Sequence, residues 1–437
     1  MRKLALAALG AIAIVSAGAQ TPAAKPDEKT LSEAYTYLLG RVLVIRQEHI
    51  DRRSDGFAYN TLKYNPLGSA DFVNPNFDVA YFEAWLAVDD RTPVLLEIPE
   101  IKGRYYTVQI LDEWGEVIVN INERTFPSKS FGKFALVKPG YRGSIPVDAA
   151  RIELHSSKAK MLGRVEIKGD PEEAVRLQQQ FKATALGMPL IAPPPALVMF
   201  DNKDLIGAEI FDDVDTRLAS ALDVAPNAAE MQQKVRAVAA YVASDKDARA
   251  AVNEQLRPII SKFKEDALTK TAPYGNHWLC ANNGGNYLAN YRLRTAANYA
   301  GIWANTPGEV VYFASTRDAN DQPFIGGDSY VMHFPADKLP ESVADAYWSV
   351  ILVGVPDFRV AANSLKRYNF NNHSGLQKET DGSLKIAIGP KPVTGVPESN
   401  WLPSAEGKPF SLTFRVYVPK DAAQKCAWTP PPLSRVD

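Results

Sequence analysis

The stretch Lys102–Thr125, KGRYYTVQILDEWGEVIVNINERT, decides the fold class of this chain. Polar and apolar residues alternate from Arg104 to Asp112 and again from Val117 to Asn122, at the period of two that is typical of half-buried strands. The Lys102-Gly103 step ahead of the first segment is a turn signal. The stretch therefore predicts two β-strands, each with one polar face.

The same alternation recurs on both sides of this stretch. In the N-terminal half it covers Phe72–Val88, Pro93–Ile98, Phe134–Val137 and Ala150–His155. In the C-terminal half it covers Val310–Ala314, Ser329–Phe334, Tyr347–Val353, Leu384–Ile388 and Leu412–Val418. Many short strands separated by turn residues favour sandwiches or barrels. We therefore predict a mainly β protein with accessory helices.

The length of the chain indicates more than one domain. Its 437 residues exceed the roughly 250 to 300 at which a single core stops growing. Apolar residues recur at helical spacing from Thr30 to His49, which predicts an amphipathic helix, and helical patterns dominate residues 171–270. We predict a signal peptide over 1–19, an N-terminal β domain with a leading helix over 20–170, a helical bridging region over 171–270 and a C-terminal β domain over 271–437.

The N-terminus, MRKLALAALGAIAIVSAGA, has the pattern of a secretory signal peptide. Basic residues precede an apolar run from Leu4 to Val15, and small residues follow it around Ala19. A membrane anchor is the alternative, but the run is shorter than the roughly 20 residues that a spanning helix needs. We expect a periplasmic or secreted protein without a stable membrane anchor.

The charge and the cysteine content of the chain limit which partners and which cellular compartment we expect. The formal net charge is -1, so we expect no binding to nucleic acid. An oxidising compartment would allow Cys280 and Cys426, the two cysteines of the chain, to form a disulfide. Two unpaired thiols are the alternative, because the sequence does not show whether the two positions meet.

A first group of polar residues lies in NPNFDVAYFEAW, residues 74–85. If this segment is a strand, Asn74, Asn76 and Asp78 share one face, where amides and a carboxylate could bind the hydroxyl groups of a ligand, with Tyr81 nearby. The alternative interpretation is a local turn in which these side chains bond backbone amides.

A second polar face follows the two strands of the opening stretch. Tyr105 and Gln109 alternate against apolar neighbours, and Asn120 and Arg124 do the same after Trp114. Amides, aromatic rings and an arginine on one sheet face are suited to a carbohydrate or a small carboxylate. A solvated outer face of a sandwich is the alternative.

A third group lies in the C-terminal half, where polar residues alternate with apolar ones between Leu412 and Val418. An arginine among aromatic residues often binds a carboxylate or phosphate, but it can equally pair with a structural residue such as Asp328. The predicted ligand-binding residues here are Arg367, Trp401, Arg415 and Tyr417.

No standard catalytic motif is present. The chain has no G-x-S-x-G elbow, P-loop or G-x-G-x-x-G, and its five histidines form no zinc motif, so we predict no metal and no cofactor. Carboxylates on neighbouring strands leave room for acid–base chemistry. The catalytic candidates are Asp78, Tyr105, Asp112 and His373.

Several motifs together resemble one family of exported bacterial proteins, which joins domain of unknown function 1254 to domain of unknown function 1214. They include FVNPNFDVAYFEAWL (72–86), YRLRTAANYAGIWAN (291–305), SYVMHFPADKLP (329–340) and FRVYVPK (414–420). The resemblance implies an immunoglobulin-like N-terminal sandwich and a jelly-roll-like C-terminal sandwich, with helices around and between them. It implies no reaction.

These observations predict an exported protein that binds a polar small molecule or glycan in a cleft between two β domains. One alternative is a metal-independent hydrolase or lyase that uses carboxylate, tyrosine and histidine groups. Another alternative is a scaffolding protein of the envelope or a homo-oligomer, in which the polar faces are interfaces.

Overall fold

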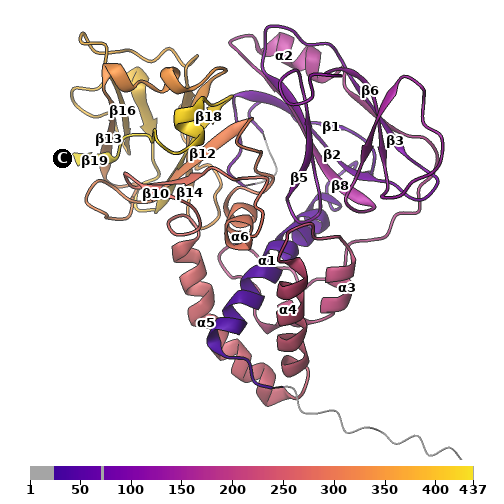
Figure 1. Ribbon diagram of the computed structural model, residues 1–437. Coiled ribbons are helices and arrows are strands. Elements are labelled where there is room, and N and C mark those ends of the chain that lie inside the picture. Colours follow the sequence, from indigo (N-terminus) through magenta and orange to yellow (C-terminus); the bar gives the residue numbers. More distant parts are fainter. Residues whose placement is uncertain (1–23, 70–72, 437) are drawn as a thin grey trace, which may run out of the picture.

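The computed structural model describes residues 24–69 and 73–436. Two β domains stand side by side, and most of the helices gather below and between them in the view of Figure 1. This arrangement confirms the predicted mainly β fold with two sandwich-like domains. The predicted signal peptide, residues 1–19, lies outside the described residues.

The N-terminal β domain contains two antiparallel-rich sheets. One has the order β1-β2-β8-β4-β5 and the other the order β7-β6-β3-β9. The strands are β1 (Lys63–Tyr64), β2 (Val79–Ala87), β3 (Val94–Ile98), β4 (Tyr106–Leu111), β5 (Val117–Ile121), β6 (Gly132–Val137), β7 (Ala149–Glu153), β8 (Lys158–Glu166) and β9 (Lys182–Ala185). Alternate residues such as Phe82, Val108 and Met161 fill the apolar core between the sheets.

The C-terminal β domain repeats this plan. One sheet has the order β10-β11-β12-β18-β14-β15 and the other the order β17-β16-β13-β19. The strands are β10 (Tyr274–Gly275), β11 (Trp278–Ala281), β12 (Val310–Ser315), β13 (Ser329–Phe334), β14 (Trp348–Gly354), β15 (Asn369–Asn371), β16 (Leu384–Gly389), β17 (Trp401–Pro403), β18 (Phe410–Tyr417) and β19 (Leu433–Val436). Phe313, Phe414 and Met332 lie in its apolar core.

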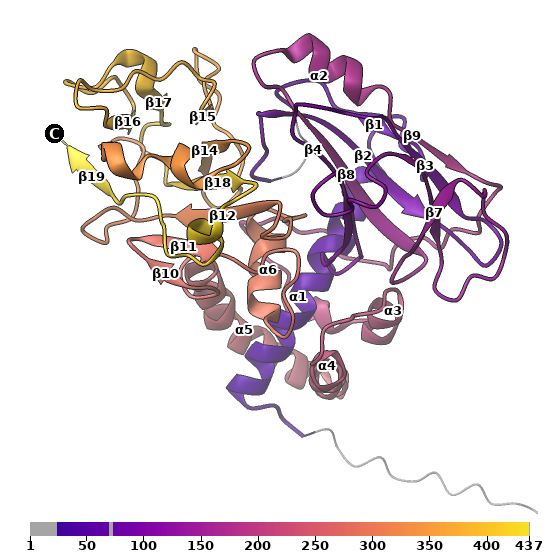
Figure 2. The same cartoon turned by 45° about the horizontal axis from the view of Figure 1, so that its top comes forward.

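Most helices lie below and between the domains, whereas α2 (Pro171–Gln178) lies at the top of the N-terminal β domain in Figure 1. The α-helices are α1 (Glu28–Asp51), α2 (Pro171–Gln178), α3 (Val214–Ala219), α4 (Ala228–Val242), α5 (Lys246–Asp266), α6 (Tyr291–Ala300) and α7 (Asp421–Gln424). Short 3-10 helices cover Ala208–Phe211, Ala336–Lys338, Pro340–Val343 and Glu398–Asn400. The two views place α6 between the C-terminal β domain and α1 (Figure 1, Figure 2). None of the helices within the described residues is long and apolar enough to cross a bilayer.

The N-terminal helix differs from its prediction. Asp27 caps α1 by accepting a hydrogen bond from the Thr30 amide at 2.7 Å, as a good N-cap residue does. The helix is not amphipathic in the structure, because it is buried on nearly all sides from Ala34 to Glu48. Helices α4, α5 and α6 and the N-terminal β domain surround it, so charged residues such as Arg41 find partners inside the protein.

The predicted strand from Phe72 to Val88 is shorter than the alternation suggested. Strand β2 begins at Val79, and residues 73–78 form a loop in which Asn74 has a positive φ of 50°. The expectation that Asn74, Asn76 and Asp78 share a strand face was therefore wrong. The chain leaves the ladder here because these side chains bond to the other domain, as described below.

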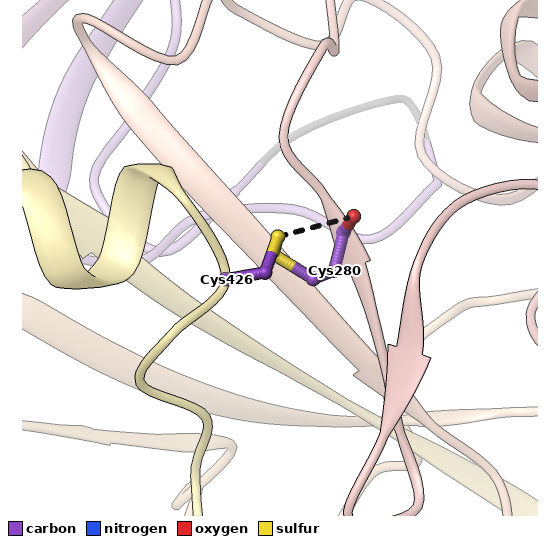
Figure 3. Close-up of a disulfide and its surroundings, with 2 residues drawn as sticks. All are labelled: Cys280 and Cys426. Atoms are coloured by element: carbon purple, nitrogen blue, oxygen red, sulfur yellow. Dashed lines mark hydrogen bonds between the residues drawn. A yellow bond between two sulfur atoms is a disulfide. The ribbon is translucent and has the colours of Figure 1, made fainter.

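Cys280 and Cys426 form a disulfide in the structure (Figure 3). Cys280 lies on β11 and Cys426 follows α7, with their Cα atoms 6.1 Å apart. The bond therefore ties the C-terminal end of the chain to the sheet that faces the N-terminal domain.

Candidate functional site

The two β domains meet through the outer faces of two sheets. On the N-terminal side, Tyr81 pairs with Arg164, and Arg164 pairs with Thr107, across β2, β8 and β4. On the C-terminal side, Tyr312 of β12 pairs with Arg415 of β18. Successive residues of a strand point to opposite faces, so these side chains face the other domain while their neighbours fill the cores.

A pocket with a cavity volume of about 90 Å³ lies where these two faces meet α6. Arg164, Arg415 and the tyrosine rings form its polar end. Leu279, Ala281 and residues of α6 and the segment after it form an apolar end. The arrangement is suited to a small molecule with one polar and one apolar part.

Arg164 is the most unusual group in the pocket. Its side chain is only 4% exposed, and its Nη1 donates to Gln109 Oε1 at 2.6 Å. Its Cζ lies 5.3 Å from the centre of the Tyr81 ring, a cation–π contact. Among the described residues no carboxylate lies within ion-pair distance of this guanidinium. Within residues 24–69 and 73–436, this buried cation therefore has no carboxylate as a counter-charge.

Arg415 is the second cation of the pocket. It is also buried, and its guanidinium donates to the Pro75 carbonyl at 3.0 Å and to the Asn74 carbonyl at 2.6 Å. These acceptors are neutral, and the part of the chain that the structure describes places no carboxylate within ion-pair distance of Arg415. The polar end of the pocket thus carries two positive charges.

Two tyrosine hydroxyl groups add hydrogen-bond donors. Tyr312 Oη accepts from the Asn305 amide at 3.1 Å, and Tyr417 Oη accepts from Asn76 Nδ2 at 2.5 Å. Burial raises the pKa of both tyrosines, so each keeps its proton at neutral pH. Since both oxygens already accept a hydrogen bond, their protons remain to be donated to a bound ligand.

The loop of residues 74–78 closes one side of the site and binds the C-terminal domain. Asn74 Nδ2 donates to Thr413 Oγ1 at 2.5 Å, and Asp78 Oδ1 accepts from Asn369 and Asn371, at 2.6 Å each. Burial raises the pKa of Asp78, while the two asparagine hydrogen bonds oppose that effect. The three polar residues of this loop thus hold the domains together, and Asn74 also lines the pocket.

The predicted face after Tyr105 serves the same interface. Tyr105 donates to Glu309 Oε2 at 3.0 Å, and Arg124 Nη2 forms an ion pair with the same oxygen at 3.0 Å. Gln109 Nε2 donates to the Ala304 carbonyl at 2.8 Å, and Asn120 Nδ2 donates to Thr306 Oγ1 at 3.1 Å. These four side chains lie on one polar face, which is buried against the second domain rather than exposed to solvent.

The four catalytic candidates do not form one cluster. Asp112 accepts from the Trp114 and Glu116 amides and lies 2.8 Å from His155 Nδ1, so it holds a turn. His373 Nε2 lies 3.3 Å from Glu166 Oε1 at the domain boundary. Asp78 and Tyr105 have the separate partners given above, and none of the four candidates lines the pocket.

Seven predicted ligand-binding residues also lie outside the pocket: Asn76, Gln109, Asn120 and Arg124 at the domain interface, and Trp114, Arg367 and Trp401 elsewhere. Trp114 is buried in the helical core, where its Nε1 donates to the Ala221 carbonyl at 3.2 Å. Arg367 donates to the Trp401 carbonyl at 2.8 Å, and Trp401 Nε1 donates to the Gly389 carbonyl at 2.9 Å. Asp328 pairs with Arg435 at 2.7 Å and not with Arg415.

The sequence interpretation missed Arg164. Its strand, β8, reads KAKMLGRVE, in which Lys158, Lys160 and Arg164 alternate with small or apolar residues. This alternation was a usable signal for a strand with one polar face. Within residues 24–69 and 73–436, no group of three His, Cys, Asp or Glu side chains is placed to hold a metal ion.

Two solved structures resemble this chain along most of its length. The crystal structure of the VPA0106 protein from Vibrio parahaemolyticus has a TM-score of 0.59 at 19% identity and covers 94% of this chain and 100% of its own. An uncharacterised protein from Burkholderia cenocepacia has a TM-score of 0.46 at 12% identity, covering 94% of this chain and 95% of its own. The first likeness supports the fold alone. No curated protein matches the chain.

Family models match both β domains in the predicted order. Residues 57–185 match the family described as "Protein of unknown function (DUF1254)". Residues 309–421 match the family described as "Protein of unknown function (DUF1214)". The first match ends at β9, which pairs with β3 and completes the second sheet of the N-terminal domain. The chain therefore belongs to the proteins in which a DUF1254 domain is followed by a DUF1214 domain.

Proposed function

We propose that this protein binds a small organic anion, of which a carboxylate is the simplest case, in the pocket between its two β domains. The observation that carries this proposal is the buried Arg164 guanidinium without a carboxylate partner among the described residues. A buried charge without a counter-charge costs several kcal/mol, and a ligand that supplies the opposite charge would offset that cost.

The neighbouring groups support an anion rather than a neutral glycan. Arg415 adds a second positive charge, and the Tyr312 and Tyr417 hydroxyl groups add donors. Guanidinium groups bind carboxylates in a planar, bidentate manner, and such charge-assisted hydrogen bonds are stronger than neutral ones. A sugar hydroxyl would leave both positive charges without compensation.

A hydrolase or lyase is less well supported. Acid–base chemistry needs a titratable group within hydrogen-bond reach of a bound substrate. Asp78, Tyr105, Asp112 and His373 are each engaged elsewhere, outside the pocket. Binding without a chemical step is therefore the function that the geometry favours.

Isothermal titration calorimetry on the purified chain tests the proposal, with sodium acetate, sodium hexanoate and inorganic phosphate as probes. We expect saturable binding of at least one carboxylate and a loss of tenfold or more in affinity for Arg164→Gln. Arg176→Gln is the matched control, because Arg176 pairs with Glu173 on an exposed surface. Equal binding by wild type and Arg164→Gln, or no binding of any probe, would overturn the proposal.

A second variant tests the same pocket in case Arg164→Gln does not fold. Tyr312→Phe removes one hydroxyl group from the pocket and leaves both arginines in place. We expect a loss of about tenfold, since a hydrogen bond to a charged group contributes about 1.5 kcal/mol or more. An unchanged affinity in this folded variant would count against the pocket as the binding site.

We also propose that the chain is exported to the periplasm or beyond. The leader pattern of residues 1–19 and the disulfide between Cys280 and Cys426 support this proposal. N-terminal sequencing of the protein from a periplasmic fraction should show a new terminus near Ala19. Recovery of the unprocessed chain from the cytoplasm alone would contradict it.

A further inference from the structure

We infer that the anion is an aliphatic monocarboxylate with a chain of several carbons, and that α6 determines the chain length that the pocket accepts. This inference rests on the proposed function and specifies its ligand. The residues that line the pocket beyond the two arginines support this inference.

The sheet that faces the pocket changes from polar to apolar from one strand to the next, between β18 and β11. On β18 the face toward the pocket carries Thr413 and Arg415, whereas on β11 it carries Leu279 and Ala281. Leu279 pairs with Ala314 across β11 and β12, so two apolar side chains lie side by side at this end. A ligand with its carboxylate at Arg415 and Arg164 would extend its other end over these residues.

Helix α6 forms the opposite wall with small side chains. Ala296, Ala297 and Ala300 line the pocket, and Gly301 follows them at the end of the helix. Residues at spacings of three and four share a face of a helix, so Ala300 lies beside both Ala296 and Ala297 in a continuous strip. The space that larger side chains would occupy is therefore left open beside the sheet.

A wall of small side chains does not by itself indicate that a ligand binds there. Arg164 supplies the independent observation, because a side chain with 96% of its surface buried lines the same pocket without a carboxylate partner among the described residues. The polar end selects the charge of the ligand. Ile302, Phe358 and the alanines offer no side-chain hydrogen bonds, so the part of the ligand that lies against them should be apolar.

Chain length is the first variable to test, by calorimetric titration of the wild type with sodium acetate, butanoate, hexanoate and octanoate. Each methylene group moved from water into an apolar site strengthens binding by about fourfold. We therefore expect the dissociation constant to fall steeply from acetate to hexanoate and to level off when the chain fills the pocket. Octylamine, with the opposite charge, should not bind.

A substitution in α6 tests where the chain lies. Ala297→Leu adds bulk to the pocket wall from a position that is only partly buried, so the helix can keep its fold. We expect octanoate to bind at least tenfold more weakly and acetate to bind as in the wild type. Ala251→Leu, a partly buried alanine of α5 outside the pocket, is the matched control and should bind every chain as the wild type does.

The outcomes separate this inference from the proposed function. If no carboxylate of any length binds, the anion pocket itself is wrong. If acetate and octanoate bind equally well, or Ala297→Leu weakens both alike, the anion pocket stands and the aliphatic chain is wrong. Length-dependent binding that Ala297→Leu abolishes for octanoate alone supports the inference.

Discussion

Asn76 and Tyr417, which lie 341 positions apart in the chain, share a hydrogen bond of 2.5 Å from Asn76 Nδ2 to Tyr417 Oη. The same amide lies 3.3 Å from Tyr347 Oη, and Asn76 Oδ1 accepts from the Asp78 amide at 2.7 Å. Asn76 thus fixes its own loop and at the same time orients a tyrosine of the pocket. The interface between the domains and the candidate site share this residue.

Asn76→Ala should weaken both the domain interface and the pocket. The substitution leaves the buried Tyr417 hydroxyl group without its donor and removes a link between the domains. We expect a loss of about 1–3 kcal/mol in the free energy of unfolding, measured by urea denaturation. Asn320→Ala, at an exposed turn, is the control and should change the stability little. Equal effects of both variants would contradict this role of Asn76.

Arg124→Met should destabilise the protein more than the loss of a surface ion pair does. Glu309 is fully buried, and Arg124 is its ion-pair partner at 3.0 Å, so the substitution leaves a buried carboxylate without its cation. Such losses cost about 3 kcal/mol or more. The matched control is Arg151→Met, which breaks an exposed pair with Glu153 and should cost below about 1 kcal/mol. Chemical denaturation of both variants at the same pH distinguishes the two cases.

The stability of the protein should depend on pH through Glu113. Burial raises the pKa of Glu113 from 4.5 to about 7, although the charges of Arg41 and Lys158 oppose this effect. Between these values the folded state holds a proton that the unfolded state has released, so the free energy of unfolding falls as pH rises. The loss is on the order of 3 kcal/mol between pH 4.5 and pH 7.

Denaturation curves from pH 4.5 to pH 7.5 measure this dependence. Glu113→Gln should flatten the curve, because the neutral amide has no proton to release. Glu116, whose pKa burial also raises to about 7, should account for part of the slope that remains. Glu153→Gln is the control at an exposed position, and it should leave the curve unchanged. If Glu113→Gln left the pH dependence of stability unchanged, Glu113 would not be the group that causes it.

Reduction of the disulfide should lower the thermal stability of the chain. Cys280 and Cys426 are separated by 146 positions, so their bond restricts a long loop of the unfolded chain. Removing such a bond typically costs about 2–5 kcal/mol. The midpoint of thermal unfolding should fall on addition of dithiothreitol. In the Cys280→Ser/Cys426→Ser variant it should already be low and should not respond, and a response there would contradict the assignment.

Local patterns predicted the strands well and the loops poorly. Alternation between Leu412 and Val418 indicated that Arg415 and Tyr417 share a face, and the structure places both in the pocket. The same kind of alternation was extended too far at Asn74, where the backbone has a positive φ. A strand ladder repeats at a fixed period, whereas a loop takes its shape from the particular groups that it contacts.

Site residues could be predicted only as far as they lay in recognisable strands. The face of Tyr105 and Gln109 was found from its period, but its role as an interface with Glu309 and Ala304 was not. Arg367 and Trp401 looked equally suitable in sequence, yet they bond to nearby carbonyl groups outside the pocket. The chemical type of a side chain does not determine which distant residues it will contact in the folded protein.

The sequence by itself determined the mainly β architecture, the two domains and the side of each strand on which polar residues lie, because these depend on the spacing of neighbouring residues. Only the tertiary structure decided that the outer faces of two sheets meet at α6, that the loop around Asn76 binds Tyr417, and that Arg164 is buried without a carboxylate partner among the described residues. These contacts join positions hundreds of residues apart, and they depend on how the two domains pack rather than on any local period.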